Sequence, residues 1–250
     1  MPKIENNISA VTRRIGQASQ DANRDPGEVL LLAVSKTRST DDIRCAIDAG
    51  LINFGENYVQ EAVEKITRLG DELEEEPRAA PLQWHFIGPL QSNKTRVVAE
   101  NFSWVHSVDR LKIAQRLSEQ RPQELGSLNI CLQINIDNEA TKAGFSPDQA
   151  LAAAEEIRQL PNLRLRGLMA IPRSQQTLEK QQLAFRALRH LRDQINQSLD
   201  NCEKLDTLSM GMSNDLEAAI SQGATIVRVG TDIFGKRDSK NSPKENYRND

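Results

Sequence analysis

The sequence is poor in the residues that metal sites and disulfide frameworks require. Its 250 residues include three cysteines and three histidines, in neither a C-x-x-C nor an H-x-x-x-H spacing. These spacings are typical of zinc sites, so the sequence argues against a metal centre. The cysteines are odd in number and far apart, so Cys45, Cys131 and Cys202 are expected to be buried or partly buried free thiols of a cytosolic protein.

Long hydrophobic runs and a strong net charge are also absent. No stretch approaches the ~20 apolar residues of a membrane span, and residues 1–7 lack the apolar core of a signal peptide. The formal net charge of -3 gives no sign of the basic surface that nucleic-acid binding requires. We therefore expect a cytoplasmic protein without nucleic-acid or membrane partners.

What the sequence does contain is a regular alternation of short apolar runs and amphipathic segments. The apolar runs, expected to be strands, cover residues 29–35, 53–56, 84–87, 104–107, 129–136, 163–170, 207–210 and 225–229. Helical spacing is expected over residues 4–22, 41–49, 59–69, 93–100, 110–119, 147–160, 178–199 and 215–222, with a short turn at 232–234.

This succession predicts an α/β fold, a single (β/α)8 TIM barrel with an extra N-terminal helix. A doubly wound open sheet is the alternative, although such sheets usually have fewer strands. The barrel domain is expected to span residues 1–235. The polar tail, residues 236–250, is expected to be disordered, and the acidic stretch Asp71 to Pro81 to be a solvated loop.

Lys36 stands directly after the first apolar run, in Ala33-Val34-Ser35-Lys36. An amine at the mouth of a core loses solvation, so its neutral, nucleophilic form becomes accessible, as a Schiff-base lysine requires. The alternative is a lysine that extends from the strand end into solvent. Taken alone, Lys36 favours this alternative, because lysines are mostly exposed.

Small and hydroxyl residues follow the last two expected strands. Ser213 is expected at the N-cap of one helix, and Gly230 with Thr231 to open the next. Free backbone N–H groups at helix starts bind anions, and barrel enzymes often bind phosphate between these two loops. Ordinary helix capping is the alternative for each position taken singly.

Arg228 lies within the last apolar run. A buried guanidinium is costly unless it is paired, so Arg228 is expected either to meet a carboxylate at the barrel rim or to face a ligand. A nucleophilic lysine, an anion cradle and a ligand-facing arginine together indicate pyridoxal 5′-phosphate (PLP). Its aldehyde would meet Lys36, its pyridine nitrogen Arg228, and its phosphate Ser213, Gly230 and Thr231.

Six motifs between residues 30 and 235 add a family resemblance. They are Ala33-Val34-Ser35-Lys36, Asn53-Phe54-Gly55-Glu56-Asn57-Tyr58-Val59-Gln60-Glu61, His85-Phe86-Ile87-Gly88-Pro89-Leu90-Gln91-Ser92-Asn93-Lys94, Gly167-Leu168-Met169, Ser209-Met210-Gly211-Met212-Ser213 and Arg228-Val229-Gly230-Thr231-Asp232-Ile233-Phe234-Gly235. With this set the chain resembles the pyridoxal phosphate homeostasis family, whose fold is the alanine-racemase-like, fold-type-III barrel.

The resemblance implies a barrel that lacks the C-terminal β-domain of alanine racemases. It also implies Lys36 as the Schiff-base lysine and Arg228 as the partner of the pyridine nitrogen. The full set of implied cofactor-binding residues is Lys36, Asn57, His85, Ser209, Met210, Ser213, Arg228, Gly230 and Thr231.

An arginine at the pyridine nitrogen limits the chemistry of the site. It stays protonated and disfavours the pyridinium form, so the ring is a weaker electron sink. Racemases of this fold also use a tyrosine from another subunit as a second acid/base. The only tyrosines in this sequence are Tyr58 and Tyr247. We expect a monomeric, non-enzymatic PLP carrier that affects vitamin B6 and amino-acid balance, with PLP-dependent apoenzymes as recipients. The alternative is a PLP-dependent amino-acid racemase, completed by His85 or Tyr58.

Three remaining features favour simpler interpretations. Lys94 and Lys142 are interpreted as solvated loop charges rather than further cofactor contacts. The helix over residues 178–199 is interpreted as scaffold. Its apolar face is expected to comprise Leu183, Leu188, Leu191 and Ile195. A barrel that serves only as an interaction surface would leave Lys36 and Arg228 unexplained.

Overall fold

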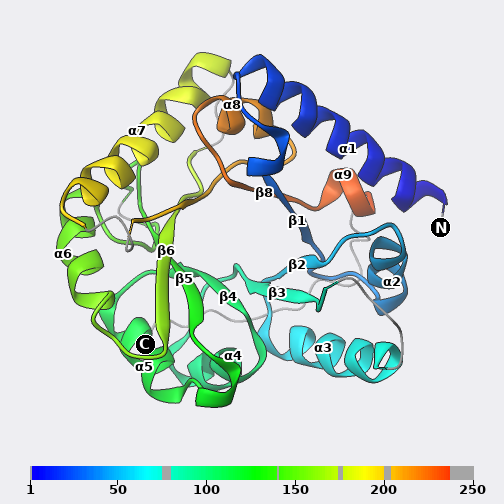
Figure 1. Cartoon of the computed structure of the whole chain (residues 1–250), viewed down its shortest axis with the longest axis horizontal. Coiled ribbons are helices and arrows are strands. Elements are labelled where there is room, and N and C mark those ends of the chain that lie inside the picture. Colours follow the sequence, from blue (N-terminus) through cyan, green and yellow to red (C-terminus); the bar gives the residue numbers. More distant parts are fainter. Residues whose placement is uncertain (1, 75–79, 140, 174–176, 200–203, 237–250) are drawn as a thin grey trace.

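A computed structural model of the chain describes residues 2–74, 80–139, 141–173, 177–199 and 204–236. These residues form a closed barrel of eight parallel strands, with helices around the outside (Figure 1). The strands pair in chain order, and β8 closes the barrel on β1. The predicted (β/α)8 architecture is therefore confirmed against the open sheet, which would leave two strand edges unpaired.

The elements lie close to their predicted positions. The strands are β1 (Leu30–Val34), β2 (Asn53–Glu56), β3 (Gln83–Phe86), β4 (Trp104–Val108), β5 (Leu128–Gln133), β6 (Leu163–Met169), β7 (Thr207–Ser209) and β8 (Ile226–Val229). The helices are α1 (Pro2–Asp21), α2 (Thr40–Asp48), α3 (Val59–Leu73), α4 (Thr95–Asn101), α5 (Leu111–Gln120), α6 (Pro147–Ile157), α7 (Leu178–Gln197), α8 (Leu216–Ser221) and α9 (Thr231–Phe234). Short 3₁₀ turns occur at Pro26–Glu28, Ser92–Lys94 and Gln123–Leu125.

The ends of α2 and α3 have a clear physical cause. Helix α2 begins at Thr40, one residue earlier than expected, and its cap is Ser39, whose hydroxyl accepts a hydrogen bond from the backbone N–H of Asp42. Helix α3 continues to Leu73, into the stretch that was predicted to be a solvated loop. It does so because Leu69 and Leu73 lie one turn apart on the same face, and both are fully buried.

The predicted apolar face of α7 is wrong at one position. Leu188, Leu191 and Ile195 are buried, but Leu183 is 55% exposed. Five residues of helix separate Leu183 from Leu188, a rotation of about 140° away from the buried face at 3.6 residues per turn. Phe185, which has the correct spacing, is buried instead.

Some predictions lie wholly or partly outside the described residues. These are the acidic stretch at 75–79, the tail at 237–250, and Cys202. The other cysteines are free thiols as predicted, with Cys45 half-buried and Cys131 buried. Among the described residues, no helix is long and apolar enough to cross a membrane, and no cluster of three or more His, Cys, Asp or Glu side chains could hold a metal ion.

Gly167 on β6 is required by close packing of neighbouring strands. A Cβ atom at this position would lie 1.8 Å from the carbonyl oxygen of Thr207 on β7. We expect Gly167→Ala to force the strands apart and to lower the free energy of unfolding by about 3 kcal/mol or more in denaturant titrations.

Gly70→Ala is the control for Gly167→Ala. Gly70 lies within α3, with open space where a Cβ would be, so alanine should stabilise the helix by up to about 1 kcal/mol. Equal stability of the two variants would contradict the proposed clash at Gly167.

Candidate functional site

The turn after β1 carries Lys36 at the face where the strands end. Lys36 is half-buried, as is Thr37 after it, whereas Ser35 before it is fully buried. Thr37 has a φ of 62°, a left-handed conformation that is unfavourable for a β-branched residue. Such a conformation persists only where surrounding contacts hold it.

Those contacts come from a buried ionic cluster, the Lys65 cluster, formed by Ser35, Glu56, Glu61 and Lys65. The Lys65 ammonium lies 2.8 Å from Glu56 Oε1 and 2.5 Å from Glu61 Oε1, and it donates to the carbonyl of Ser35 at 2.8 Å. The Ser35 hydroxyl donates to Glu56. The backbone N–H of Thr37 donates to Glu61. The cluster therefore fixes the residues on both sides of Lys36.

Electrostatics make the Lys65 cluster sensitive to loss of its cation. Glu56 is fully buried, and its Oε2 atom has no hydrogen-bond partner among the residues that the structure describes. Burial raises the pKa of Glu56, while the neighbouring Lys65 opposes that rise. Lys65 thus stabilises the charged form of a carboxyl group, a form that burial alone disfavours.

Arg228 is the second main feature of the site. It is 5% exposed on β8, and its register partner on β1 is Leu32, four residues before Lys36. The guanidinium donates from Nη1 to the carbonyl and hydroxyl of Ser209, and from Nη2 to the carbonyl of Ala170. No carboxylate of the described residues lies within ion-pair distance of it, although the nearby charge of Asp215 partly opposes the lowering of its pKa. The rim ion pair, one of the two alternatives, is therefore not found.

The protonation and unused donors of Arg228 suit it to a ligand. Burial lowers its pKa to about 10, so the guanidinium stays charged at neutral pH. Three of its five N–H groups have partners within the described part of the chain. Nε and one Nη2 hydrogen are left for a ligand acceptor, which fits a pyridine nitrogen or an anion.

A chain of hydrogen bonds continues from Arg228 into the barrel interior. His106 Nδ1 lies 2.7 Å from the hydroxyl of Ser209, and His106 Nε2 lies 3.0 Å from His85 Nδ1. The remaining nitrogen of His85 lies 3.2 Å from Asn53 Oδ1. Both histidines are fully buried. The barrel therefore contains a polar spine (Asn53, His85, His106, Ser209, Arg228) that crosses its interior from β2, β3 and β4 to β7 and β8.

The structure buries His85 completely inside the barrel. Its two nitrogens face His106 and Asn53, and its ring stacks on Trp104 with centroids 5.4 Å apart. His106 links it to Ser209 and was missed by sequence reasoning. The signal was available: two polar residues, His106 and Ser107, lie between Val105 and Val108 in an otherwise apolar strand.

The loop after β7 differs from the prediction. Helix α8 begins at Leu216, and its N-cap is Asp215 rather than Ser213. The Asp215 carboxylate accepts from the N–H of Met212, which closes the turn that contains Ser213. Met210, at the start of this loop, is fully buried.

The loop after β8 agrees with the prediction. Helix α9 starts at Thr231, with Gly230 as its N-cap. A Cβ atom on Gly230 would lie 3.2 Å from the carbonyl oxygen of Val34, at the end of β1. The start of α9 therefore packs against the strand that leads into Lys36.

Helix α1 braces these two loops from outside the barrel (Figure 1). The Arg14 guanidinium pairs with Glu217 on α8 at 2.8 Å and with Asp232 on α9 at 2.6 Å. It also donates to the carbonyl of Ser213. The extra N-terminal helix thus links Ser213 to α9.

The loop after β2 contributes Asn57. Its Oδ1 atom is buried without a hydrogen-bond partner in the described structure. A Cβ on Gly88 would lie 2.2 Å from the carbonyl oxygen of Asn57, so the loops after β2 and β3 touch here. Asn57 thereby offers an unused acceptor at the end of β2.

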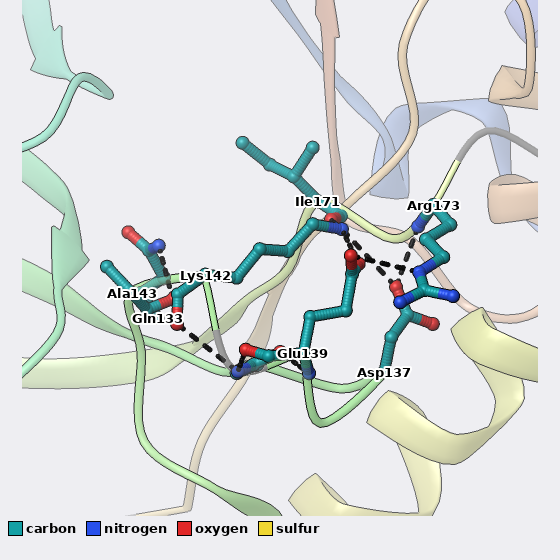
Figure 2. Close-up of polar contacts among 8 residues, drawn as sticks. Gln133, Asp137, Glu139, Lys142, Ala143, Ile171 and Arg173 are labelled. Carbon is teal, nitrogen blue, oxygen red and sulfur yellow. Dashed lines mark hydrogen bonds and ion pairs between the residues drawn. The ribbon is translucent and has the colours of Figure 1, made fainter.

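The loops after β5 and β6 are joined by ion pairs, the rim cluster of Asp137, Glu139, Lys142 and Arg173 (Figure 2). Lys142 lies 2.6 Å from Glu139 and 3.4 Å from Asp137, and it donates to the carbonyl of Ile171. Arg173 lies 3.0 Å from Glu139. Lys142 is therefore not the solvated loop charge that was predicted, since two carboxylates and a carbonyl surround it.

Comparison with known proteins gives consistent matches. The family model of the alanine racemase N-terminal domain matches residues 6–238. The pyridoxal phosphate homeostasis protein of Pseudomonas aeruginosa is 57% identical over 238 residues, which cover 95% of this chain and 97% of that protein.

Solved structures show the same pattern. PipY of Synechococcus elongatus PCC7942, with PLP bound, is 36% identical, with a TM-score of 0.77 over 93% of this chain and all of that chain. An alanine racemase of Clostridium difficile 630 is 14% identical, with a TM-score of 0.66 over 98% of this chain but 59% of the racemase. The racemase match shows a shared fold alone, over part of the longer enzyme.

Proposed function

Because the chain belongs to the pyridoxal phosphate homeostasis protein family, we propose that it holds PLP as a Schiff base on Lys36, without catalytic turnover, to maintain intracellular PLP and amino-acid balance. PLP-dependent apoenzymes are the proposed recipients. The observation that carries the proposal is Arg228, a buried charged guanidinium with two unused donors and no carboxylate partner in the described chain. Its strand, β8, is paired with β1, which leads into Lys36.

Different residues are proposed to bind different parts of PLP. Bound PLP supplies an aldehyde that condenses with a primary amine to give a C=N bond and one water. Lys36 provides the amine, and the Lys65 cluster holds its turn in place. Arg228 donates to the pyridine nitrogen and keeps it unprotonated. We propose the loops after β7 and β8 for the phosphate, through Ser213, Gly230 and Thr231.

The remaining predicted residues have supporting roles in the proposal. Asn57 offers its unpartnered Oδ1 atom beside the cofactor. Met210 lies buried at the start of the loop after β7 and would pack against the ring. Ser209 holds Arg228 through two hydrogen bonds.

The surroundings of His85 support a holder of PLP over a racemase. A racemase requires a second base that can reach the substrate. Both nitrogens of His85 are engaged inside the barrel, and burial lowers its pKa to about 3. Of the two candidates for that base, this leaves Tyr58, at the N-cap of α3.

The site of attachment is tested by chemical trapping. The protein is incubated with PLP, desalted, reduced with borohydride, digested and mapped by mass spectrometry. We expect the phosphopyridoxyl group on the peptide that contains Lys36. A label on Lys94 or Lys142 in its place, or no label, would contradict the proposal.

Turnover is tested separately with PLP-loaded protein and L-alanine, followed by chiral chromatography. We expect no D-alanine above the level that free PLP produces. Formation of D-alanine that depends on Lys36 would favour the racemase alternative, and its loss in Tyr58→Phe would identify the second base.

A further inference from the structure

In the polar spine behind Arg228, only one assignment of donors and acceptors gives the Ser209 hydroxyl and both histidine N–H groups an acceptor. Arginine only donates, so the Ser209 hydroxyl accepts from Nη1. Its single hydrogen can then go to His106 Nδ1, 2.7 Å away. Neutral His106 therefore carries its proton on Nε2 and donates to His85 Nδ1. His85 in turn donates from Nε2 to the Oδ1 atom of Asn53.

The opposite direction leaves a group unsatisfied. If His106 donated from Nδ1, the Ser209 hydroxyl would accept from both His106 and Arg228. Its own hydrogen would then lack an acceptor among these residues, at a fully buried position. A buried donor without an acceptor costs about 1–3 kcal/mol. The direction from Arg228 to Asn53 is therefore favoured.

The two histidines keep this direction at neutral pH. Burial holds the pKa of His106 well below its ordinary value, with His85 and Arg228 lowering it further. Trp104 stacks on His85, and the Arg166 guanidinium covers Trp104 at 4.9 Å. The rings are thus packed in place as well as hydrogen-bonded.

We infer that His106 is a positioning residue for the pyridine nitrogen of the ligand, acting through Ser209 on Arg228. The inference rests on the proposed PLP function. His106 accepts the hydroxyl hydrogen of Ser209, which turns the oxygen lone pairs toward Arg228. The guanidinium is then held in one orientation, with its unused donors free for the ligand. His85 and Asn53 hold the ring of His106 in the tautomer that this requires.

Two substitutions at His106 separate positioning from packing. His106→Leu removes the acceptor for Ser209, while His106→Asn can place an amide oxygen close to the position of Nδ1. The ligands are PLP and its analogue with C–H in place of the ring nitrogen. We expect His106→Leu to weaken PLP binding about tenfold, a change of about 1.4 kcal/mol. It should weaken binding of the analogue less than twofold, and His106→Asn should recover most of the PLP affinity.

Further variants keep the test valid if His106→Leu folds poorly. Ser209→Ala removes the hydroxyl that links His106 to Arg228, so it should cause a similar selective loss of PLP affinity. The double variant should lose no more PLP affinity than either single variant. Leu117→Ala, which truncates a fully buried side chain on α5, controls for general destabilisation. Melting temperatures are measured for all variants.

The outcomes are distinct. A selective loss for PLP, shared by His106→Leu and Ser209→Ala, supports the positioning role. Equal losses for PLP and the analogue, or unchanged PLP affinity in both variants, would overturn it. Failure of the unsubstituted protein to bind PLP would instead overturn the proposed function.

Discussion

Lys36→Ala should abolish covalent retention of PLP. After incubation and desalting, the unsubstituted protein is expected to keep a visible absorption band from the Lys36–PLP linkage, and the variant to show none. The reason is chemical, since only a primary amine forms the C=N bond. PLP should still bind the variant reversibly through Arg228, and equilibrium dialysis should detect that weaker binding.

The control for Lys36 is Lys94→Ala. Lys94 ends the 3₁₀ turn after β3, and its removal should leave the band unchanged. A band that persists in Lys36→Ala and disappears in Lys94→Ala would move the linkage to the loop after β3. If none of the proteins showed the absorption band, the assignment of PLP as the cofactor would be contradicted.

Lys65→Met should destabilise the protein by about 3–5 kcal/mol, because it leaves a buried carboxylate without its cation. Glu56 is fully buried, and Lys65 is 5% exposed. The same substitution removes a hydrogen bond to the Ser35 carbonyl, so the turn that carries Lys36 should loosen. Urea titration measures the first effect, and the rate of Schiff-base formation measures the second.

The loss in Lys65→Met should depend on pH. Burial already raises the pKa of Glu56, and removal of Lys65 raises it further. The folded variant then holds a proton that the unfolded chain releases, so its stability falls as pH rises above the ordinary carboxyl pKa. The free energy of unfolding of Lys65→Met should therefore be lower near neutral pH than at about pH 5.

Arg68→Met is the control for Lys65→Met on the same helix. Arg68 pairs with Glu72 on the surface, with its side chain 60% exposed, so little change is expected. Equal stability of Lys65→Met and Arg68→Met at neutral pH would show that Glu56 does not need its ion pair.

Features that depend on local pattern were predictable. The apolar runs predicted eight strands, and β2 was correct at both ends. Lys36 could be placed after β1, and Gly230 at the start of α9, because both positions follow directly from where a strand ends. Ser213 as N-cap was wrong, because the chain makes a turn there, in which the Asp215 N–H donates to the Met212 carbonyl, and the helix begins only at Leu216.

The sequence by itself determined the barrel, the strand-end position of Lys36 and the presence of Arg228 in a buried strand. Periodicity and burial are set residue by residue along the chain, so they can be read from it. Only the tertiary structure decided that Ser209 and His106, 103 residues apart, share a hydrogen bond. It also decided that Lys65 holds the turn of Lys36. Such contacts depend on barrel closure and on side-chain direction, which no local pattern contains.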